Sequence, residues 1–308
     1  MSAPHVSVVI PALNGRGTLP ALLDALAAQR TDGPIETIAI DSGSSDGTVQ
    51  LLRARADCLI QIDPQRFDHG LTRNLGVERA RGDLVVLMVQ DAEPVSADWL
   101  AALTRPFAVD PVLAGTYARQ IARDDASQIT RHYHQRWQAS SETPRVSQMA
   151  GRSEFLALTP WDRYDRCIFD NVCSCIRRSA WQQHPFRATA MAEDLEWARE
   201  VLLAGYRIAY VPSAVVRHSH ERPARDEYRR TVLVHRRLRE LFDLVLIPDA
   251  PRLLRALMTS AAAHLRANAS LDPRAVARAL ALAVAYPLGQ YRGVRSARPF
   301  AIPVEGGP

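Results

Sequence analysis

The stretch that decides the fold is IAIDSGSSDGT, residues 38–48. Its apolar branched residues predict a core strand, and that run stops at Asp41. Small and hydroxyl-bearing residues follow, and Asp46 then stands where a new helix is expected to begin. Ser and Gly let a backbone turn tightly or approach another group closely. The stretch therefore predicts a strand whose carboxyl end either turns sharply or holds something polar.

The same alternation extends on both sides of this stretch. Short apolar runs predict strands at 6–10, 35–40, 58–62, 84–89 and 112–117, and helical patterns lie between them at 18–29, 48–55, 71–80 and 97–107. Strand and helix in alternation predict an α/β fold with a mostly parallel sheet flanked by helices. Ligands of such sheets gather beyond the carboxyl ends of the strands.

The second half of the chain is less regular. Residues 121–164 are polar without a clear period, which predicts a helix and then a long irregular segment, a candidate lid or acceptor loop. A strand at 170–176, a helix at 194–204 and short strands at 208–211 and 214–216 follow. Helices at 229–246, 251–266 and 274–286 are expected to be broken by Pro248, Pro251, Pro273 and Pro287. We therefore predict a catalytic domain at 1–222 and a helical C-terminal extension at 223–308.

Composition sets broad limits. The 308 residues carry a formal net charge of +5, and every fixed positive side chain is Arg because the chain has no Lys. The four Cys lack the spacing of a zinc site, so reduced core thiols are expected. We see no signal peptide and no run of about 18 apolar residues that could span a membrane. A cytoplasmic protein is expected, with possible peripheral contact at the cytoplasmic face of the inner membrane.

Acidic residues follow several predicted strands. Asp41 ends one strand, and Asp91 follows another in VQDAEP. Asp46, ahead of Gly47 and Thr48, is better explained as a helix cap. Because the strand ends meet at one edge of the sheet, Asp41 and Asp91 are candidate ligand-binding residues.

Three further motifs carry candidate chemistry. Arg73 lies near the start of a predicted helix, where a guanidinium can reach a phosphate or simply pair with a surface acid. Glu193 and Asp194 begin another helix, and either could accept a proton or cap the helix. His218 and His220 alternate at the end of a strand, a spacing compatible with a divalent metal site or with structural histidines.

Six motifs of the chain, in their order along it, resemble those of family-2 glycosyltransferases of the GT-A fold. They are VVIPALN, DSGSSDGT, HGLTRNLGVERARGD, VLMVQDAEP, AEDLEWAREVLLAGY and VRHSH. Three further details resemble a bacterial rhamnosyltransferase-like subgroup of this family. They are QDA at the metal position, the late HSH, and LGQYRG near the end of the chain. The resemblance covers about residues 5–220. It implies an inverting transferase that moves a sugar, with rhamnose a candidate, in cell-surface polysaccharide synthesis.

The resemblance also assigns roles to residues. It implies a dTDP- or UDP-linked sugar as donor, bound by Pro11, Ala12, Asn14, Asp41, Ser42, Arg73 and Gln90. The usual DxD motif is altered, because Val89 stands at its first acid and Asp91 at its second. Asp91 would hold Mg²⁺ or Mn²⁺ with His218 or His220, of which His218 is favoured. Asp194, beside Glu193, would deprotonate the hydroxyl of a glycan or lipid-linked acceptor.

Two alternatives remain open, a nucleotidyltransferase and a non-catalytic, degenerate transferase-like subunit. Nucleic acid is not expected as a partner, because aromatic residues are not interleaved with the Arg residues. In the C-terminal region, VLVHRRLRELFDLVLI has apolar residues at near-helical spacing beside an Arg-rich face. This amphipathic surface could dock on anionic lipid, or pack against the catalytic domain or a twin subunit.

Overall fold

The computed structural model describes residues 6–31, 33–268, 270 and 272–301. The chain divides into two compact units. The first contains Met1–Arg123, His134–Phe155 and Cys167–His218, and the second contains Asp124–Tyr133, Leu156–Arg166 and Ser219–Pro308. Two internal segments thus join the C-terminal part of the chain, and the domain division at residue 222 stays a prediction.

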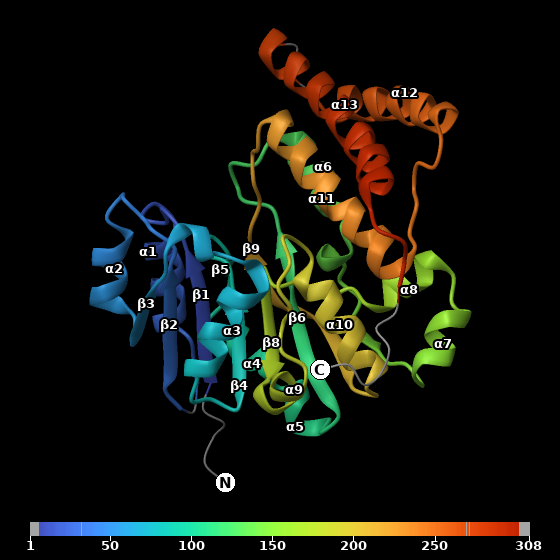
Figure 1. The fold of residues 1–308 in the computed structure, drawn as a ribbon. Coiled ribbons are helices and arrows are strands. Elements are labelled where there is room, and N and C mark those ends of the chain that lie inside the picture. The colour runs from blue at the N-terminus through green and yellow to red at the C-terminus, as the bar shows by residue number, and fades with distance from the viewer. Residues whose placement is uncertain (1–5, 32, 269, 271, 302–308) are drawn as a thin grey trace. The chain divides into compact units, whose positions relative to one another are not determined.

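The first unit is built on one mixed sheet, drawn in Figure 1. Its strands are β1 (Val6–Ala12), β2 (Ile35–Asp41), β3 (Cys58–Gln61), β4 (Leu84–Met88), β5 (Glu93–Pro94), β6 (Leu113–Ile121), β7 (Arg145–Ser147), β8 (Cys173–Arg177) and β9 (Arg207–Arg217). The order is β3-β2-β1-β4-β8-β6-β9-β5, with β7 also paired to β9. The four strands β3, β2, β1 and β4 are parallel, so their carboxyl ends share one edge.

Helices connect these strands, as the sequence predicts. They are α1 (Leu19–Ala27), α2 (Thr48–Arg55), α3 (His69–Arg79), α4 (Trp99–Thr104), α5 (Pro106–Val109), α9 (Arg178–Gln183) and α10 (Glu193–Leu203). A 3₁₀ turn, η1 (Pro64–Arg66), precedes α3. The single helix predicted at 97–107 is wrong, because Pro106 opens a separate helix. Proline is favoured at the first helical position, where its missing N–H is not needed.

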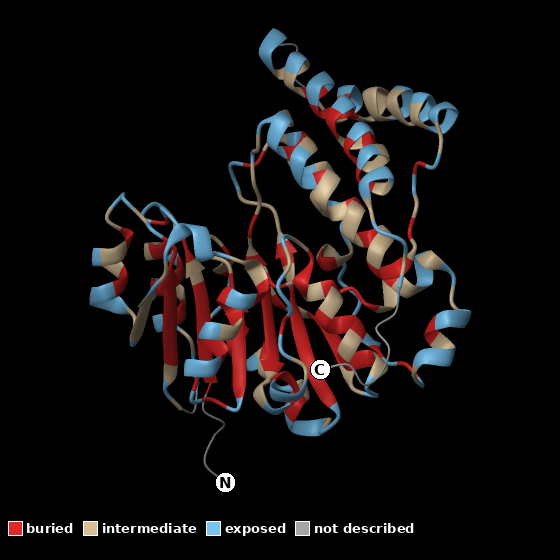
Figure 2. Cartoon of the chain, viewed as in Figure 1, coloured by how far each residue is buried: buried red, intermediate tan, exposed pale blue. Residues whose placement is uncertain are grey.

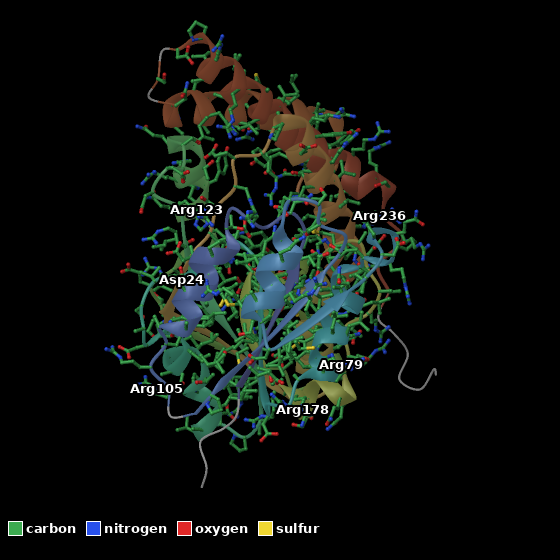
Figure 3. The ribbon with its side chains drawn as sticks, turned by 90° about the vertical axis from the view of Figure 1, so that its left-hand side faces the viewer. Asp24, Arg79, Arg105, Arg123, Arg178 and Arg236 are labelled. Carbon is green, nitrogen blue, oxygen red and sulfur yellow. The ribbon has the colours of Figure 1, made fainter. Side chains whose placement is uncertain are left out.

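Burial explains why the parallel strands are so apolar. In Figure 2 the strands β1, β2 and β4 are almost entirely buried, whereas the outer helices are largely exposed. Strands covered by helices on both faces are expected to read as continuous apolar runs. Many charged side chains lie on the surface, and Figure 3 labels three exposed ones, Asp24 on α1, Arg79 on α3 and Arg105 after α4.

The second half of the sheet differs from the prediction in one strand. The two short strands predicted at 208–211 and 214–216 form the continuous strand β9. Its pairing with β6 shifts register between Ala118 and Arg119, where Val211 and Val215 are their respective partners. A bulge of this kind bends a strand without ending it, which is why the residues between the two predicted strands read as a break.

The segment predicted to be one helix and irregular chain is largely folded. It contains α6 (Gln128–Gln135), the 3₁₀ turn η2 (Gln138–Ser140), β7 and α7 (Arg152–Ala157), and it leads into α8 (Pro160–Arg166). These elements are short, and several are polar. Short polar elements carry little hydrophobic periodicity, so the sequence pattern did not reveal them.

The second unit contains α8 and three longer helices, α11 (Ala224–Phe242), α12 (Ala250–Ala267) and α13 (Pro273–Ser296). The prediction that Pro287 ends the last helix is wrong, because α13 runs through it. Tight packing against α11 accompanies this continuity. A Cβ added at Gly293 would lie 2.5 Å from the carbonyl oxygen of Val232, and one at Gly289 would lie 2.7 Å from Thr231 Cβ.

This packing also settles the face of α11. The residues on its apolar stripe, including Leu238, Leu241 and Phe242, are buried, and the Phe242 ring packs edge-on against Tyr164 of α8. The stripe predicted as a candidate lipid face therefore belongs to the interior of the second unit. Within the described residues, no helix combines the length and apolar character needed to cross a bilayer.

Candidate functional site

Asp41 lies at the carboxyl end of β2, beside Ala12 at the end of β1. Its side chain is 1% exposed. Oδ2 accepts hydrogen bonds from the backbone N–H groups of Gly43 and Ser44, at 3.0 and 3.1 Å. Oδ1 is buried without a hydrogen-bond partner. A buried carboxylate oxygen without a donor is costly, so Asp41 presents an acceptor that a bound ligand could satisfy.

The loop after β1 is held to the loop after β2. The carboxamide oxygen of Asn14 accepts from Ser45 N–H, and the Asn14 N–H donates to Ser44 Oγ. Asn14 itself has a positive φ of 49°, a conformation that Asn tolerates better than most residues. Ser42 Oγ donates to the Ala12 carbonyl at 3.1 Å. Asn14 and Ser42 thus fix the shape of this edge, and Pro11 and Ala12 supply backbone to it.

Gln90 also has a structural partner in the first loop. Its Oε1 accepts from Leu13 N–H and its Nε2 donates to the Leu13 carbonyl, both at 2.9 Å. Since both amide atoms already have backbone partners, Gln90 joins the end of β4 to the loop after β1. Its predicted contact with a donor stays a prediction.

The N-cap of α2 is Gly47 rather than the predicted Asp46, although Asp46 bonds to the first residue of the helix. Its Oδ1 accepts from the backbone N–H and the hydroxyl of Thr48 at the start of α2, and its Oδ2 accepts from Arg16 N–H. These bonds lower the pKa of the Asp46 carboxyl, first through the Thr48 hydroxyl. Its carboxylate therefore serves the local structure.

Arg73 and Glu193 form a buried ion pair. Arg73 Nη1 lies 3.0 Å from Glu193 Oε1 and donates to the His69 carbonyl at 2.8 Å. Burial alone would raise the pKa of Glu193, but the charges of Arg73 and His69, together with hydrogen bonds that include one from Asn171, lower that pKa. Glu193 is thus held as a carboxylate by Arg73. The predicted donor contact of Arg73 stays a prediction, and its buried Nε has no hydrogen-bond partner.

Asp194 has a different environment from its neighbour. It is partly exposed, and its oxygens accept from Leu195 N–H at 2.8 Å and Asn171 N–H at 3.3 Å. Burial, followed by the negative charges of Glu193 and Asp170, raises the pKa of Asp194 well above its usual range. A carboxylate with a raised pKa is a stronger proton acceptor. Of the two adjacent acids, the structure leaves Asp194 suited to proton transfer.

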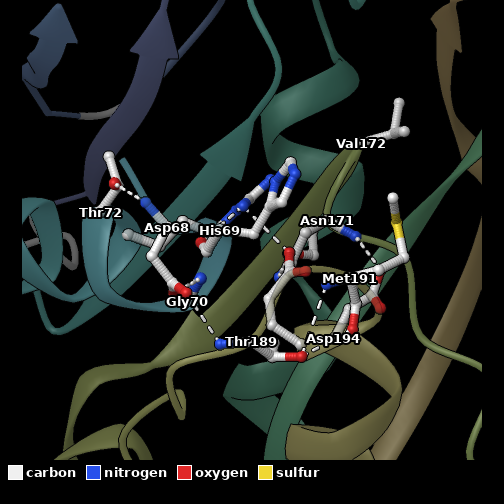
Figure 4. Close-up of polar contacts among 12 residues, drawn as sticks. Asp68, His69, Gly70, Thr72, Asn171, Val172, Thr189, Met191 and Asp194 are labelled. Carbon is white, nitrogen blue, oxygen red and sulfur yellow. Dashed lines mark hydrogen bonds and ion pairs between the residues drawn. The ribbon is translucent and has the colours of Figure 1, made fainter. Parts of the chain in front are cut away.

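The turn that presents Asp194 is tightly held. Figure 4 shows this segment, which leads into α10, beside the start of α3. Asp68 accepts from Gly70 N–H at the start of α3 and, through its other oxygen, from Thr189 N–H at 2.9 Å. A Cβ added at Gly70 would lie only 2.1 Å from the Arg187 carbonyl oxygen. The residue before α10, Ala192, adopts a positive φ of 62°. Such strain in a non-glycine residue is common where a side chain must be aimed.

Asp91 and His218 lie together at the end of the sheet. His218 Nε2 is 3.7 Å from Asp91 Oδ1, and the backbone carbonyl of Asp91 accepts from Arg123. Asp91 and His218 each offer a ligand atom to a metal, as a carboxylate and an imidazole do. His220 follows His218 by two residues and belongs to the start of the second unit. Its part in a metal site stays a prediction.

The hydrogen bonds around His218 define its tautomer. Gln120 Nε2 donates to Asp170 Oδ2 at 2.6 Å, which leaves Gln120 Oε1 for His218 Nδ1 at 3.2 Å. A carbonyl oxygen can only accept, so Nδ1 carries a proton and Nε2, which lies nearer Asp91, is the nitrogen that could bind a metal. An outer partner of this kind is what orients a metal-binding histidine. The donor set of Asp91 and His218 therefore fits a divalent cation such as Mg²⁺ or Mn²⁺.

Sequence reasoning missed four residues of this site. Asp68, Gln120, Asp170 and Asn171 lie in the network, and Asn171 contacts both Glu193 and Asp194. Asp68 could have been found, because it precedes a helical pattern as a cap. Gln120 and Asp170 lie 50 positions apart in the sequence. No local pattern signals a hydrogen bond between them.

Comparisons with known proteins identify the family. The family model for glycosyl transferase family 2 matches residues 7–182. The chain is 32% identical to the O-antigen chain rhamnosyltransferase RfbN of Salmonella typhimurium, over 73% of this chain and 69% of that protein. It is 29% identical to the O-antigen chain rhamnosyltransferase WbaN of Salmonella anatum, over 74% and 70%.

Solved structures show the same fold. The mannosyltransferase PcManGT from Pyrobaculum calidifontis, in complex with GDP-Man and Mn²⁺, gives a TM-score of 0.54 at 20% identity. That match covers 91% of this chain and 74% of the other. Glucosyl-3-phosphoglycerate synthase from Mycobacterium tuberculosis, in complex with Mn²⁺, UDP and glucosyl-3-phosphoglycerate, gives 0.51 at 20% identity, over 72% and 74%. The fold is therefore the GT-A fold that the sequence resemblance implied.

Proposed function

The chain belongs to glycosyl transferase family 2, and on that premise we propose that it is a metal-dependent, inverting transferase. Its donor is a sugar linked to a nucleoside diphosphate, with dTDP and UDP as the candidate nucleotides. Its acceptor is a glycan or a lipid-linked glycan, and rhamnose is the candidate sugar because the named Salmonella relatives are rhamnosyltransferases. The family match favours this proposal over a nucleotidyltransferase.

One observation supports the proposal most strongly. The parallel strands β2 and β4 lead to Asp41, with its unpartnered buried oxygen, and to Asp91, which faces His218. The first residue can accept a hydrogen bond from a base, and the second pair can hold a cation at a diphosphate. A divalent cation bound there would neutralise the diphosphate and stabilise it as a leaving group.

The chain's own residues supply the remaining steps of the proposed reaction. Asp41 Oδ1 accepts from the N–H of a pyrimidine base. Asp194 removes the proton from the acceptor hydroxyl, whose oxygen then attacks the anomeric carbon. The bond from that carbon to the phosphate oxygen breaks, and its electron pair leaves with the nucleoside diphosphate. One displacement of this kind inverts the anomeric configuration.

Thermal shifts with a panel of nucleotide sugars, with and without Mn²⁺, test the donor site. We expect at least one pyrimidine nucleotide sugar to raise the melting temperature only when Mn²⁺ is present. Asp91→Asn is expected to remove that effect. The matched control is Asp83→Asn, since Asp83 is exposed at the opposite end of β4. The proposal would be contradicted if the melting temperature of the wild-type protein rose equally with and without Mn²⁺. It would also be contradicted if Asp91→Asn kept the full Mn²⁺-dependent shift.

A further inference from the structure

The helices α12 and α13 have an unusual charge distribution. Their sequences, APRLLRALMTSAAAHLRA and PRAVARALALAVAYPLGQYRGVRS, contain seven Arg and no Asp or Glu. Acids stand only at the caps before them, Asp249 and Asp272. In contrast, α11 mixes Arg with acids such as Glu227 and Glu240. Two of the seven Arg residues on α12 and α13 form ion pairs with acids outside the two helices, Arg252 with Asp249 and Arg278 with Glu221. The other five have no acid on their own helix.

Each of these helices also exposes an apolar stripe. On α12, Leu254 and Met258 are each 61% exposed, and Leu265 lies on the same face. At 100° per residue these three positions fall within about 40° of arc. On α13, Leu280, Val284 and Leu288 repeat every four residues and are all exposed. Single exposed apolar residues are ordinary, whereas aligned ones indicate a contact surface.

Arg residues border the stripe of α12. Arg255 and Arg266 are exposed and lie about 100° and 120° from Leu254 around the helix axis. An apolar stripe bordered by Arg, without acids, is the pattern of a helix that lies in a membrane interface. Anionic headgroups would pair with the guanidinium groups while the apolar side chains enter the boundary of the acyl chains.

We propose that α12 and α13 form a docking surface for an anionic lipid bilayer. The surface is defined by Leu254, Met258 and Leu265 of α12, by Leu280, Val284 and Leu288 of α13, and by the Arg residues beside them. Charge complementarity favours a bilayer with anionic headgroups as the partner. An acidic protein could pair with the Arg residues, but nothing requires it to match two apolar stripes as well. The inference adds a membrane partner to the proposed transferase and moves the contact away from α11.

Vesicle flotation of the full-length protein, without donor or acceptor, tests this surface. We expect binding to vesicles of phosphatidylcholine with phosphatidylglycerol, and much weaker binding to phosphatidylcholine alone. The triple variant Leu254→Gln, Met258→Gln, Leu265→Gln is expected to lower the partition coefficient by roughly tenfold or more. Its matched control is Val109→Gln with Val146→Gln, which changes residues of the first unit that are 82% and 62% exposed.

A second pair of variants tests the charges. Arg255→Gln with Arg266→Gln is expected to weaken binding roughly tenfold, whereas Arg53→Gln with Arg105→Gln, exposed residues of the first unit, should not. Equal binding to both vesicle types, or no loss in either α12 variant, would overturn the inference. So would sedimentation showing a stable dimer that the triple variant dissociates, with no vesicle binding. Donor-dependent thermal shifts are read separately, so failure here leaves the transferase proposal standing.

Discussion

Arg73 Nη1 and Glu193 Oε1 lie 3.0 Å apart, with side chains only 5% and 6% exposed. This pair lies under the turn that presents Asp194, and it separates the roles of the two adjacent acids. Glu193 is paired with Arg73, and Asp194 is the acid that we propose as the base. The consequences can be measured on stability and on activity separately.

Breaking the pair is expected to be costly. Arg73→Ala leaves Glu193 buried without its main countercharge, and a loss of about 3–5 kcal/mol in unfolding free energy is expected. Urea denaturation measures it. The double variant Arg73→Met, Glu193→Met should recover most of the loss, because no buried charge then remains. Arg30→Ala, which removes an exposed partner of Asp98, is the control and should change stability little.

Removing the proposed base should act on turnover alone. Asp194→Asn keeps the shape of the side chain but cannot accept a proton, so kcat is expected to fall about 10²–10⁴-fold. Nucleotide affinity, measured by calorimetry, should be nearly unchanged. The control is Glu196→Gln in the first turn of the same helix. An Asp194→Asn variant with wild-type turnover would mean that another group removes the proton.

The dependence of kcat/KM on pH is expected to change when the charge of Asp170 is removed. Asp194 faces the negative charges of Glu193 and Asp170, while Arg73 and His69 act on Glu193 from α3. Because Asp170 raises the pKa of Asp194, neutralising it should lower that pKa. The acidic limb of kcat/KM is therefore expected to move to lower pH in Asp170→Asn. Asp83→Asn should leave the profile unchanged, and a shift of the limb to higher pH would contradict the assignment.

Gln120 is expected to act through His218. Gln120→Leu removes the acceptor for His218 Nδ1 and the donor to Asp170, so the imidazole loses its orientation. Loss of such an outer partner typically lowers metal affinity about 10–100-fold. Titration of Mn²⁺ in the presence of nucleoside diphosphate measures it. Gln182→Leu, an exposed residue of α9, is the control. Unchanged Mn²⁺ affinity in Gln120→Leu would argue against His218 as a ligand.

His235 predicts how the second unit responds to acid. Burial lowers the pKa of His235 to about 4, and its Nδ1 has no hydrogen-bond partner. Since the folded pKa lies below the unfolded one, stability is retained above pH 6.5 and is lost as the pH falls from there toward 4. The loss from this group is expected to reach up to roughly 3 kcal/mol. His235→Leu should reduce that loss, as urea denaturation at several pH values would show. A variant with an unchanged pH dependence would exclude this explanation.

The α/β class could be read from the chain without coordinates, and so could the position of Asp41 at the end of a strand. The apolar runs, the acid-ended strand at Asp41 and the bonds of Asp46 to Thr48 are local features. Local steric and hydrogen-bonding preferences are enough to define them. Parallel pairing follows from the helical crossovers, so the meeting of Asp41 and Asp91 at one sheet edge could be expected before any coordinates.

The pairing of polar and charged side chains with one another could be seen only in the folded chain. Three features depend on residues far apart in the sequence. They are the pairing of Arg73 with Glu193, the hydrogen bonds that join His218 through Gln120 to Asp170, and the helix that continues through Pro287. Burial creates these relationships, because a desolvated charge or amide must find a partner wherever the fold brings one within reach. Hydrophobic periodicity and secondary-structure propensity describe neighbouring residues only, so they do not predict which distant groups will pair.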